Sequence, residues 1–354
     1  MKQLFKYYLA TSLLLAAIST TAYAVTYKIT DLGTQGEYMS NASEINDLGM
    51  VVGSTYSGGG PILPQGFMWD GTMHLLEPLP GESWSKAFDI NNSGVVVGSS
   101  GGRAFMWDGT MHGFEVEALP WGNPISASLI NDSGVIVGNI LFDNSSILQT
   151  FLWDGTMHIL DGLAGPYDTV PIDINESGVV VGHSSDRVYK PVMWDRITHE
   201  LIIPQWIDNG IISGINNSGT VVGSSFDPYS GGSRAFMWDG TLRFLDTIPG
   251  MVVFGPTDIN DSGVIVGSRI DRAFMWDGTS HDLNDLIDPS TPGWVLKGAS
   301  AINNKGQIVG YGSLDGGRQR AYLATPVPEP SSMVALLCGL GGLGAMIRRR
   351  NLTK

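Results

Sequence analysis

The chain has 354 residues, of which 43% are hydrophobic and 15% charged, a composition that excludes an intrinsically disordered protein and suits one large or two ordinary domains. Residues 25–330 contain 14 Lys and Arg against 34 Asp and Glu, and the resulting net charge of −20 disfavours nucleic acid and anionic lipid as partners. The 47 glycines are interspersed with valine, isoleucine and aromatic residues, which indicates many short strands joined by tight turns.

The first 24 residues have the three parts of an export signal. Lys2 and Lys6 are basic, residues 9–18 are almost entirely apolar, and Ala22 and Ala24 form a small-x-small cleavage site. The apolar run is shorter than the roughly 20 residues that a membrane-spanning helix needs. We therefore expect residues 1–24 to be a cleaved signal peptide and the mature chain to begin at residue 25.

A nine-residue motif recurs seven times in the body of the chain. The copies are INDLGMVVG from Ile45, INNSGVVVG from Ile90, INDSGVIVG from Ile130, INESGVVVG from Ile174, INNSGTVVG from Ile215, INDSGVIVG from Ile259 and INNKGQIVG from Ile302. The intervals of 40 to 45 residues are typical of a four-stranded propeller blade, and no 3.6-residue apolar pattern accompanies them, as helical repeats would require. The sequence predicts an all-β, seven-bladed propeller over residues 25–325.

Each unit predicts four strands, which we call a to d. Strand a ends at Ile-Asn, a turn of sequence Asn-x-Ser-Gly follows, strand b is GVVVG, strand c is AFMWD and strand d is MHxL. We expect Asp-Gly to form a two-residue hairpin turn between c and d with both residues at positive φ, and Asn with Ser-Gly to act similarly before b. The seventh unit ends at 321–324 without a strand d. Residues 26–33 (TYKITDLG) resemble a strand d without a strand c, and we expect them to complete the seventh blade and close the ring.

The pattern xAFMWDGTMHxLxxLPG followed by SxAxxINxSGxVVG resembles the HAF family of extracellular repeats, and the resemblance spans nearly all of residues 26–324. It implies export and a repeat architecture, and it implies no activity. The Trp-Asp pair that ends strand c is also distantly similar to WD-repeat propellers. The Gly-His pair of those proteins does not occur at the blade boundary, so their interaction function is not carried over.

Histidine and asparagine recur in register, and neither predicts a metal site. Five histidines follow the tryptophan of their unit by five residues: His74, His112, His158, His199 and His281. Equivalent positions on a ring lie too far apart to share one metal, so we expect surface or cross-strand roles. His183 is expected to stand alone in a b–c loop. The loops of the motif asparagines hold at most one carboxylate each, too few for calcium, which leaves a turn-forming role.

The sequence contains no motif that predicts catalysis or a cofactor. It lacks G-x-S-x-G, H-E-x-x-H and a phosphate-binding glycine loop, and its single cysteine, Cys338, lies outside the body. Propeller glycosidases use carboxylates gathered near the axis, and the sequence leaves open whether any of the 34 acids gather there.

The connections between strands differ in variability. The a–b and c–d turns are short and uniform, whereas the b–c and d–a loops vary, and by strand parity both variable sets emerge on one face. Each d–a loop holds an aromatic residue outside the repeat register, and these are the candidate ligand-binding residues: Tyr38, Trp84, Trp121, Tyr167, Trp206, Phe254 and Trp294. Aromatic rings on one face can stack against sugars. The alternative is that they seal the gaps between blades.

Residues 326–354 form a three-part tail. A proline-rich segment with Pro328, Glu329 and Pro330 precedes an uncharged apolar run, 333–347, and then come Arg348, Arg349 and Arg350. The tail resembles the PEP-CTERM sorting signal of Gram-negative bacteria, which implies processing by an exosortase near the Pro-Glu-Pro sequence and surface display or release. As a helix, the apolar run would rise only about 24 Å, short for a bilayer, and the arginines should remain cytoplasmic, which places the body outside.

Together these features predict an exported, non-catalytic binding or structural module at the cell surface or outside the cell, associated with exopolysaccharide or a biofilm matrix. The expected partners are an exosortase during processing and a polysaccharide or another surface protein at an aromatic, acidic loop face. Membrane contact is expected only through the C-terminal helix. Two alternatives stay open: an extracellular glycan hydrolase or lyase with carboxylates near the propeller axis, and a passive spacer in an exopolysaccharide layer.

Overall fold

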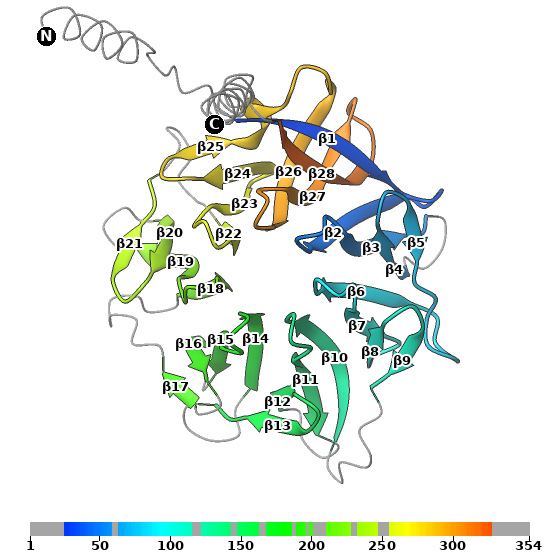
Figure 1. Cartoon of the computed structure of the whole chain (residues 1–354), viewed down its shortest axis with the longest axis vertical. Coiled ribbons are helices and arrows are strands. Elements are labelled where there is room, and N and C mark those ends of the chain that lie inside the picture. Colours follow the sequence, from blue (N-terminus) through cyan, green and yellow to red (C-terminus); the bar gives the residue numbers. More distant parts are fainter. Residues whose placement is uncertain are drawn as a thin grey trace, which may run out of the picture. The chain divides into compact units, whose positions relative to one another are not determined.

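The computed structural model describes residues 25–58, 63–114, 122–142, 147–162, 168–185, 189–195, 198–200, 210–227, 232–246 and 255–327. These residues form seven four-stranded antiparallel sheets arranged in a ring, a seven-bladed β-propeller (Figure 1). A one-turn 3-10 helix, η1 (Leu283–Leu286), follows the sixth sheet. The predicted signal peptide and C-terminal tail lie outside the described residues. In the part of the chain that is described, no helix is long and apolar enough to cross a membrane.

Six blades take their four strands consecutively along the chain, from the axis outward. Blade 1 comprises β2 (Met39–Ile45), β3 (Val51–Tyr56), β4 (Pro64–Trp69) and β5 (Met73–Leu75). Blade 2 comprises β6 (Ser85–Ile90), β7 (Val96–Ser100), β8 (Arg103–Trp107) and β9 (Met111–Gly113). Blade 3 comprises β10 (Gly122–Ile130), β11 (Ile136–Phe142), β12 (Leu148–Trp153) and β13 (Met157–Leu160).

The next three blades repeat this order. Blade 4 comprises β14 (Asp168–Ile174), β15 (Val180–Ser185), β16 (Tyr189–Trp194) and β17 (Thr198–Glu200). Blade 5 comprises β18 (Ile211–Ile215), β19 (Val221–Asp227), β20 (Gly232–Trp238) and β21 (Leu242–Phe244). Blade 6 comprises β22 (Gly255–Ile259), β23 (Ile265–Arg269), β24 (Arg272–Trp276) and β25 (Ser280–Asp282).

Blade 7 is assembled from both ends of the body. β26 (Trp294–Ile302), β27 (Ile308–Leu314) and β28 (Gln319–Val327) are joined on the outside by β1 (Thr26–Gly33), in the order β26-β27-β28-β1. An ion pair of 2.6 Å between Arg320 and Asp31 holds β1 to β28. The Ser40 hydroxyl links this blade to blade 1, because it donates to the Gly33 carbonyl oxygen at 2.6 Å and accepts from the Ala321 amide at 2.9 Å. The predicted closure of the ring by the N-terminal strand is confirmed.

Both recurring turns form where they were expected, but the c–d turn differs in detail. Trp69 pairs with Met73, so the connection has three residues, Asp-Gly-Thr, and the Asp70 amide donates to the Thr72 carbonyl oxygen at 3.3 Å. The prediction of a two-residue turn with both residues at positive φ was wrong. Only the glycine takes positive φ, +119° at Gly71, because the added threonine lets the aspartate keep an ordinary conformation.

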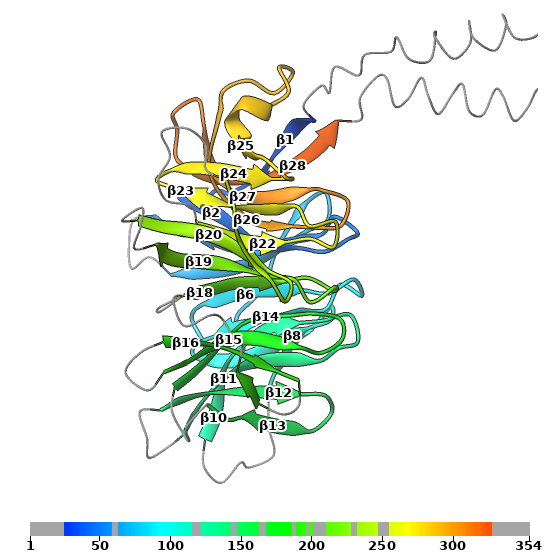
Figure 2. The same ribbon diagram turned by 90° about the vertical axis from the view of Figure 1, so that its left-hand side faces the viewer.

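The strand pairings give the ring two distinct faces. The a–b and c–d turns lie on one, the turn face, and the b–c and d–a connections lie on the other, the loop face. Ala324 of β28 pairs with Ile308, directly after an a–b turn, so β28 ends on the turn face. Figure 2 shows β1 beginning on the same side as β28 ends. The chain therefore enters and leaves the propeller on the turn face.

The hydrophobic core lies between blades. Val51 belongs to a buried cluster with Ala301 and Leu323 of blade 7, whereas the next residue, Val52, belongs to a cluster with Ile90 and other residues of blade 2. Successive residues of a strand point to opposite faces of its sheet, so the valine pair of the repeated motif serves both neighbours of each blade. This use of both faces explains why strand b is apolar throughout instead of alternating.

Candidate functional site in the axial channel

The ends of the inner strands and the a–b turns surround a cavity of about 220 Å³ at the axis. Eight carboxylates border it, in two layers. The deeper layer, which we call the inner acids, consists of Glu44, Asp89, Asp173 and Asp258. The second layer, the mouth acids, lies one residue beyond the motif asparagines and consists of Asp47, Asp132, Glu176 and Asp261. The described residues that line the cavity include no Lys, Arg or His.

The inner acids occupy the position directly before the motif isoleucine. In β2 the Asn46 amide bonds to the Met50 carbonyl oxygen. The adjacent pair, Ile45 and Val51, is then a non-hydrogen-bonded pair of the antiparallel ladder, and the Ile45 N–H points away from β3 toward the channel. All seven inner strands repeat this arrangement. Seven buried amides thus require acceptors that the sheets do not provide.

Three aspartates supply acceptors for six of these amides, each serving two blades. Asp89 accepts from Ile90 in its own blade and from Ile130 in the next, both at 2.7 Å. The other two aspartates repeat this bridge: Asp173 with Ile174 and Ile215 at 2.7 Å, and Asp258 with Ile259 at 2.7 Å and Ile302 at 2.8 Å. The blades between them need no acid, and they carry Leu129, Gly214 and Ala301 at this position.

Glu44 serves the amide that remains, because seven is odd. Its Oε1 accepts from the Ile45 amide of its own blade at 3.0 Å. Blades 2 to 7 form three pairs that each share one aspartate, so no neighbouring blade shares an acid with blade 1. The longer glutamate side chain folds back onto its own strand. The inner acids therefore have a structural task that accounts for both their number and their spacing.

Burial raises the pKa of every inner acid. It is the largest cause at Glu44 and Asp173, whose pKa values lie well above the usual range, and neighbouring carboxylates add to it. Burial raises the pKa of Asp89 to about 7 and that of Asp258 to about 6, although the two amides that each accepts lower it. Near neutral pH the layer therefore holds protons that ordinary carboxylic acids have lost.

The motif asparagines form a closed ring of hydrogen bonds around the channel. Each side-chain Oδ1 accepts amides of its own a–b turn, as Asn46 does from Leu48 at 3.0 Å and Met50 at 2.9 Å. Each Nδ2 donates to the asparagine carbonyl oxygen of the next blade at 2.9–3.3 Å, and Asn303 closes the ring onto Asn46: Asn46, Asn91, Asn131, Asn175, Asn216, Asn260 and Asn303. The turn-forming role is confirmed, and the link between blades is an additional one.

The mouth acids form another ring with the asparagines that occupy the same position in the other three blades, Asn92, Asn217 and Asn304. The Asn92 amide and side chain both donate to Asp132 at 2.7 Å, and Asn217 does the same to Asp261 at 2.9 and 3.0 Å. Burial and the Asp132 charge raise the pKa of Glu176. Across the described residues, no group of three or more His, Cys, Asp or Glu side chains is placed to hold a metal ion. The layers can accept hydrogen bonds and exchange protons.

Three of the seven predicted aromatic site residues fall within the described residues. Tyr38 is 41% exposed on the loop face, with the Arg318 guanidinium 4.1 Å from its ring centroid. Trp84 is half-buried. Trp294 is buried and packs edge-on to Tyr322 at 6.2 Å. Trp121, Tyr167, Trp206 and Phe254 lie outside the described residues. The structure does not bring the three together, and the gathered acids lie at the opposite end of the inner strands.

Two expectations about histidine are resolved. His183 lies within β15 and not in a loop; its Nε2 accepts from the Ile212 amide of blade 5 at 3.0 Å, and burial lowers its pKa. His74, His112, His158 and His281 each contact the aspartate and threonine of their own c–d turn. The side chain of His199 lies outside the described part of the structure. The inner acids were not predicted from the sequence. Four of the seven units have an acid directly before Ile-Asn, and because equivalent positions of a propeller's inner strands surround the axis, this repetition was the signal that predicts a cluster.

Comparison with known proteins identifies the fold. No family model and no curated protein matches the chain. A structure described as YCF48 bound to D1 peptide is similar, with TM-score 0.53, 10% identity, and coverage of 87% of this chain and 98% of that one. Virginiamycin B lyase from Staphylococcus aureus matches with TM-score 0.52 and 11% identity over 85% of this chain and 100% of the lyase. Acylaminoacyl peptidase from Pyrococcus horikoshii matches with TM-score 0.50 and 11% identity over 83% of this chain but 53% of the peptidase.

Proposed function

We propose that the protein is an exported, non-catalytic binding module that holds a polysaccharide or another surface protein on its loop face. The observation that carries this proposal is the distribution of exposed apolar side chains. Of the eight large hydrophobic residues exposed among the described residues, six lie on the loop face: Tyr38, Leu63, Leu141, Ile211, Ile270 and Val295. A partner that lies across the loop face would contact exposed apolar side chains from five blades, and variable loops on a rigid scaffold are where binding surfaces usually lie.

Ile270 is the strongest candidate for direct contact with a partner. It is 81% exposed at the b–c turn of blade 6 and has φ of +32°, a conformation that is unfavourable for a β-branched residue. The corresponding turn of blade 2 is Gly101-Gly102, which adopts positive φ without strain. Isoleucine in this turn costs folding energy without packing into the core, and contact with a partner is a reason for it.

The hydrogen bonds of the inner acids support placing the binding site on the loop face and not in the channel. Three of the inner acids accept two amides each and Glu44 accepts one, so these carboxylates have a task in the fold that requires no substrate. Of the solved propellers with similar fold, the one described as YCF48 is bound to a peptide, which supports a protein partner beside a polysaccharide.

Export is part of the proposal, and the strand boundaries are compatible with both processing events. β1 begins at Thr26, directly after the expected signal cleavage, and β28 ends at Val327, directly before Pro328-Glu329-Pro330. Cleavage at both places leaves every strand of the propeller intact. Intact-mass measurement of the protein from its native host tests this: a mature chain that starts at Val25 and ends near Glu329 supports it, and retention of residues 1–24 contradicts it.

A glycan hydrolase or lyase is the second candidate, favoured by the four inner acids with raised pKa values. A general acid needs a proton near neutral pH, and Asp89 with a pKa of about 7 meets that requirement. The second carboxylate oxygen of Glu44 has no hydrogen-bond partner among the described residues, which leaves it facing the channel.

One experiment separates the two candidates. Neutral and acidic polysaccharides and extracellular peptides are screened for binding and for turnover with the full chain, the loop-face variants Tyr38→Ala and Ile270→Gly, and Asp89→Asn. Leu48→Ser is the matched control, because Leu48 is 65% exposed on the turn face and five other blades carry serine there. The binding proposal predicts capture that only the loop-face variants weaken. Turnover that Asp89→Asn abolishes would overturn it in favour of the enzyme.

A further inference from the structure

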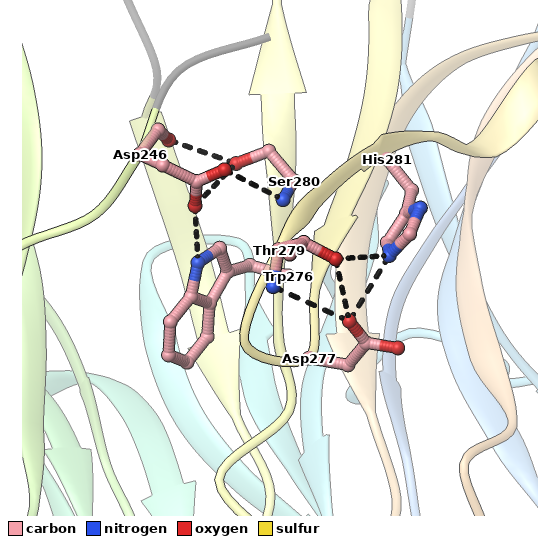
Figure 3. Close-up of polar contacts among 6 residues, drawn as sticks. All are labelled: Asp246, Trp276, Asp277, Thr279, Ser280 and His281. Carbon is pink, nitrogen blue, oxygen red and sulfur yellow. Dashed lines mark hydrogen bonds and ion pairs between the residues drawn. The ribbon is translucent and has the colours of Figure 1, made fainter.

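The c–d hairpins of blades 1, 2, 3 and 6 hold the same three side chains in the same arrangement. In each, an aspartate Oδ1, a threonine Oγ1 and a histidine Nε2 form a triangle. The aspartate–histidine distances are 2.9, 3.0, 3.1 and 3.0 Å, and the threonine–histidine distances are 3.1, 2.7, 2.9 and 2.9 Å. The aspartate–threonine distances are 3.3, 3.1, 3.0 and 3.4 Å. Figure 3 shows the blade 6 copy, Asp277, Thr279 and His281.

The hairpin itself fixes this triangle. The three residues are two apart, at the first and third turn positions and the second residue of strand d, so their side chains project from one side. In blade 1, the Thr72 amide donates to Asp70 Oδ1 at 3.4 Å, and the Asp70 amide donates to the Thr72 carbonyl oxygen. Because His74 pairs with Met68 in the ladder, its ring starts from a fixed point of the sheet. The donors are therefore arranged before any ligand binds.

We propose that each Asp-Gly-Thr-x-His hairpin is a binding site for one divalent transition-metal ion such as Zn²⁺, Ni²⁺ or Co²⁺. Ligand bonds of about 2.1 Å separate adjacent donor atoms by about 3.0 Å around an octahedral ion such as Ni²⁺ or Co²⁺ and by about 3.4 Å around a tetrahedral ion such as Zn²⁺. The sides of the triangles are 2.7–3.4 Å, closest to the octahedral spacing, so one ion can replace the hydrogen bonds of a triangle with little movement. The threonine hydroxyl is a neutral, weak ligand, so the carboxylate and the imidazole provide most of the binding energy.

The donor set selects the class of ion. Imidazole nitrogen suits Zn²⁺, Ni²⁺ and Co²⁺, whereas Ca²⁺ requires six to eight oxygen donors that these hairpins lack. The histidine and aspartate side chains are 49% and 46% exposed in blade 1, so the remaining coordination positions are open to water or to an anionic group of a partner. A body of net charge −20 further favours cations at its surface.

Blade 5 provides the natural comparison. Its hairpin has Arg243 in place of histidine, and the guanidinium forms a 2.5 Å ion pair with Asp239. Arginine is positively charged and has no lone pair to offer a metal. This hairpin should not bind the ion, and Arg243→His should create a site, since Asp239 and Thr241 occupy the same positions as in the other hairpins and the Thr241 amide donates to Asp239 Oδ1 at 3.2 Å, the turn contact that the others also have.

The test titrates the full chain with NiCl₂ at pH 7.5 by calorimetry and by histidine NMR. We expect saturable binding, paramagnetic broadening of the His74, His112, His158 and His281 ring signals, and no broadening of buried His183. His74→Gln should remove one site, Thr72→Val should weaken one site, and Arg243→His should add one, with unchanged thermal unfolding in the absence of metal. Absence of saturable binding, or a stoichiometry that none of these variants changes, would overturn the proposal, and binding abolished by Asp132→Asn would place the ion at the channel mouth instead.

Discussion

Replacing Asp89 by alanine tests whether the inner acids hold neighbouring blades together. The change removes the acceptors that the described residues provide for the Ile90 and Ile130 amides, and both residues are buried, at 4% and 6% exposure. Leaving a buried donor without an acceptor costs about 1–3 kcal/mol. Water in the adjoining cavity can satisfy part of this loss, so we expect the free energy of unfolding to fall by about 2–4 kcal/mol and the melting temperature by about 5–10 °C.

The assay is urea unfolding followed by tryptophan fluorescence at pH 5.5 and pH 8. Burial raises the pKa of Asp89 to about 7, so ionisation of its carboxyl above that pH weakens the native state, and the loss caused by Asp89→Ala should be larger at pH 5.5 than at pH 8. Asp89→Asn keeps one acceptor oxygen and should lie between the wild type and Asp89→Ala at pH 5.5. Asp132→Ala, at the exposed mouth, is the control and should cost less than about 1 kcal/mol. If Asp89→Ala unfolds within about 0.5 kcal/mol of the wild type at both pH values, the bridging role is refuted.

Three further predictions follow from the same contacts. The folded-state pKa values of the inner acids are raised, so their stabilising contribution is complete below the unfolded-state pKa values near 4 and is lost as the pH rises through about 6 and 7. The urea midpoint of unfolding should therefore fall from pH 5.5 to pH 8, and a midpoint that rises would contradict this. Gly98→Ala should destabilise by more than about 3 kcal/mol, because a Cβ there overlaps the Lys86 carbonyl oxygen and the Phe105 ring. Gly113→Ala should be nearly neutral in the same assay, because a Cβ there meets the Arg103 and Leu79 side chains at ordinary van der Waals distances. Trp294→Ala should lower the melting temperature through lost packing against Tyr322, whereas Trp84→Ala should lower it less, and equal effects would remove the distinction between buried and partly exposed loop aromatics.

Much of the fold could be predicted from periodicity. The seven copies of the Ile-Asn motif set the number of blades, and residues 26–33 had a strand pattern without a partner, which predicted the closure of the ring. The length of the c–d turn was predicted incorrectly, because Asp-Gly is a common two-residue turn and nothing in the sequence places Met73, and not Thr72, opposite Trp69. His183 was assigned to a loop because strand b extends further than the GVVVG motif.

The channel was harder to predict than the ring. Glu44 and Asp89 stand at equivalent positions in strands a, but the motif was defined from the isoleucine onward, and the residue before it varies among glutamate, aspartate, leucine, glycine and alanine. That variation is meaningful only once neighbouring blades are known to share acceptors, because one aspartate then satisfies two amides and its neighbour needs none. The rule depends on spatial contact between units about 43 residues apart, which a single sequence does not display.

The direct test of the closed ring is amide hydrogen exchange of residues 319–327 in the full chain and in a variant that lacks residues 25–33. β28 lies between β27 and β1, so its amides should exchange slowly in the full chain, and those that face β1 should exchange quickly once β1 is removed, with loss of solubility as the strand edge is exposed. The corresponding strand of blade 2, residues 103–107, should keep its protection in both proteins. Equal exchange of residues 319–327 in the two proteins would contradict closure of the propeller by its first strand.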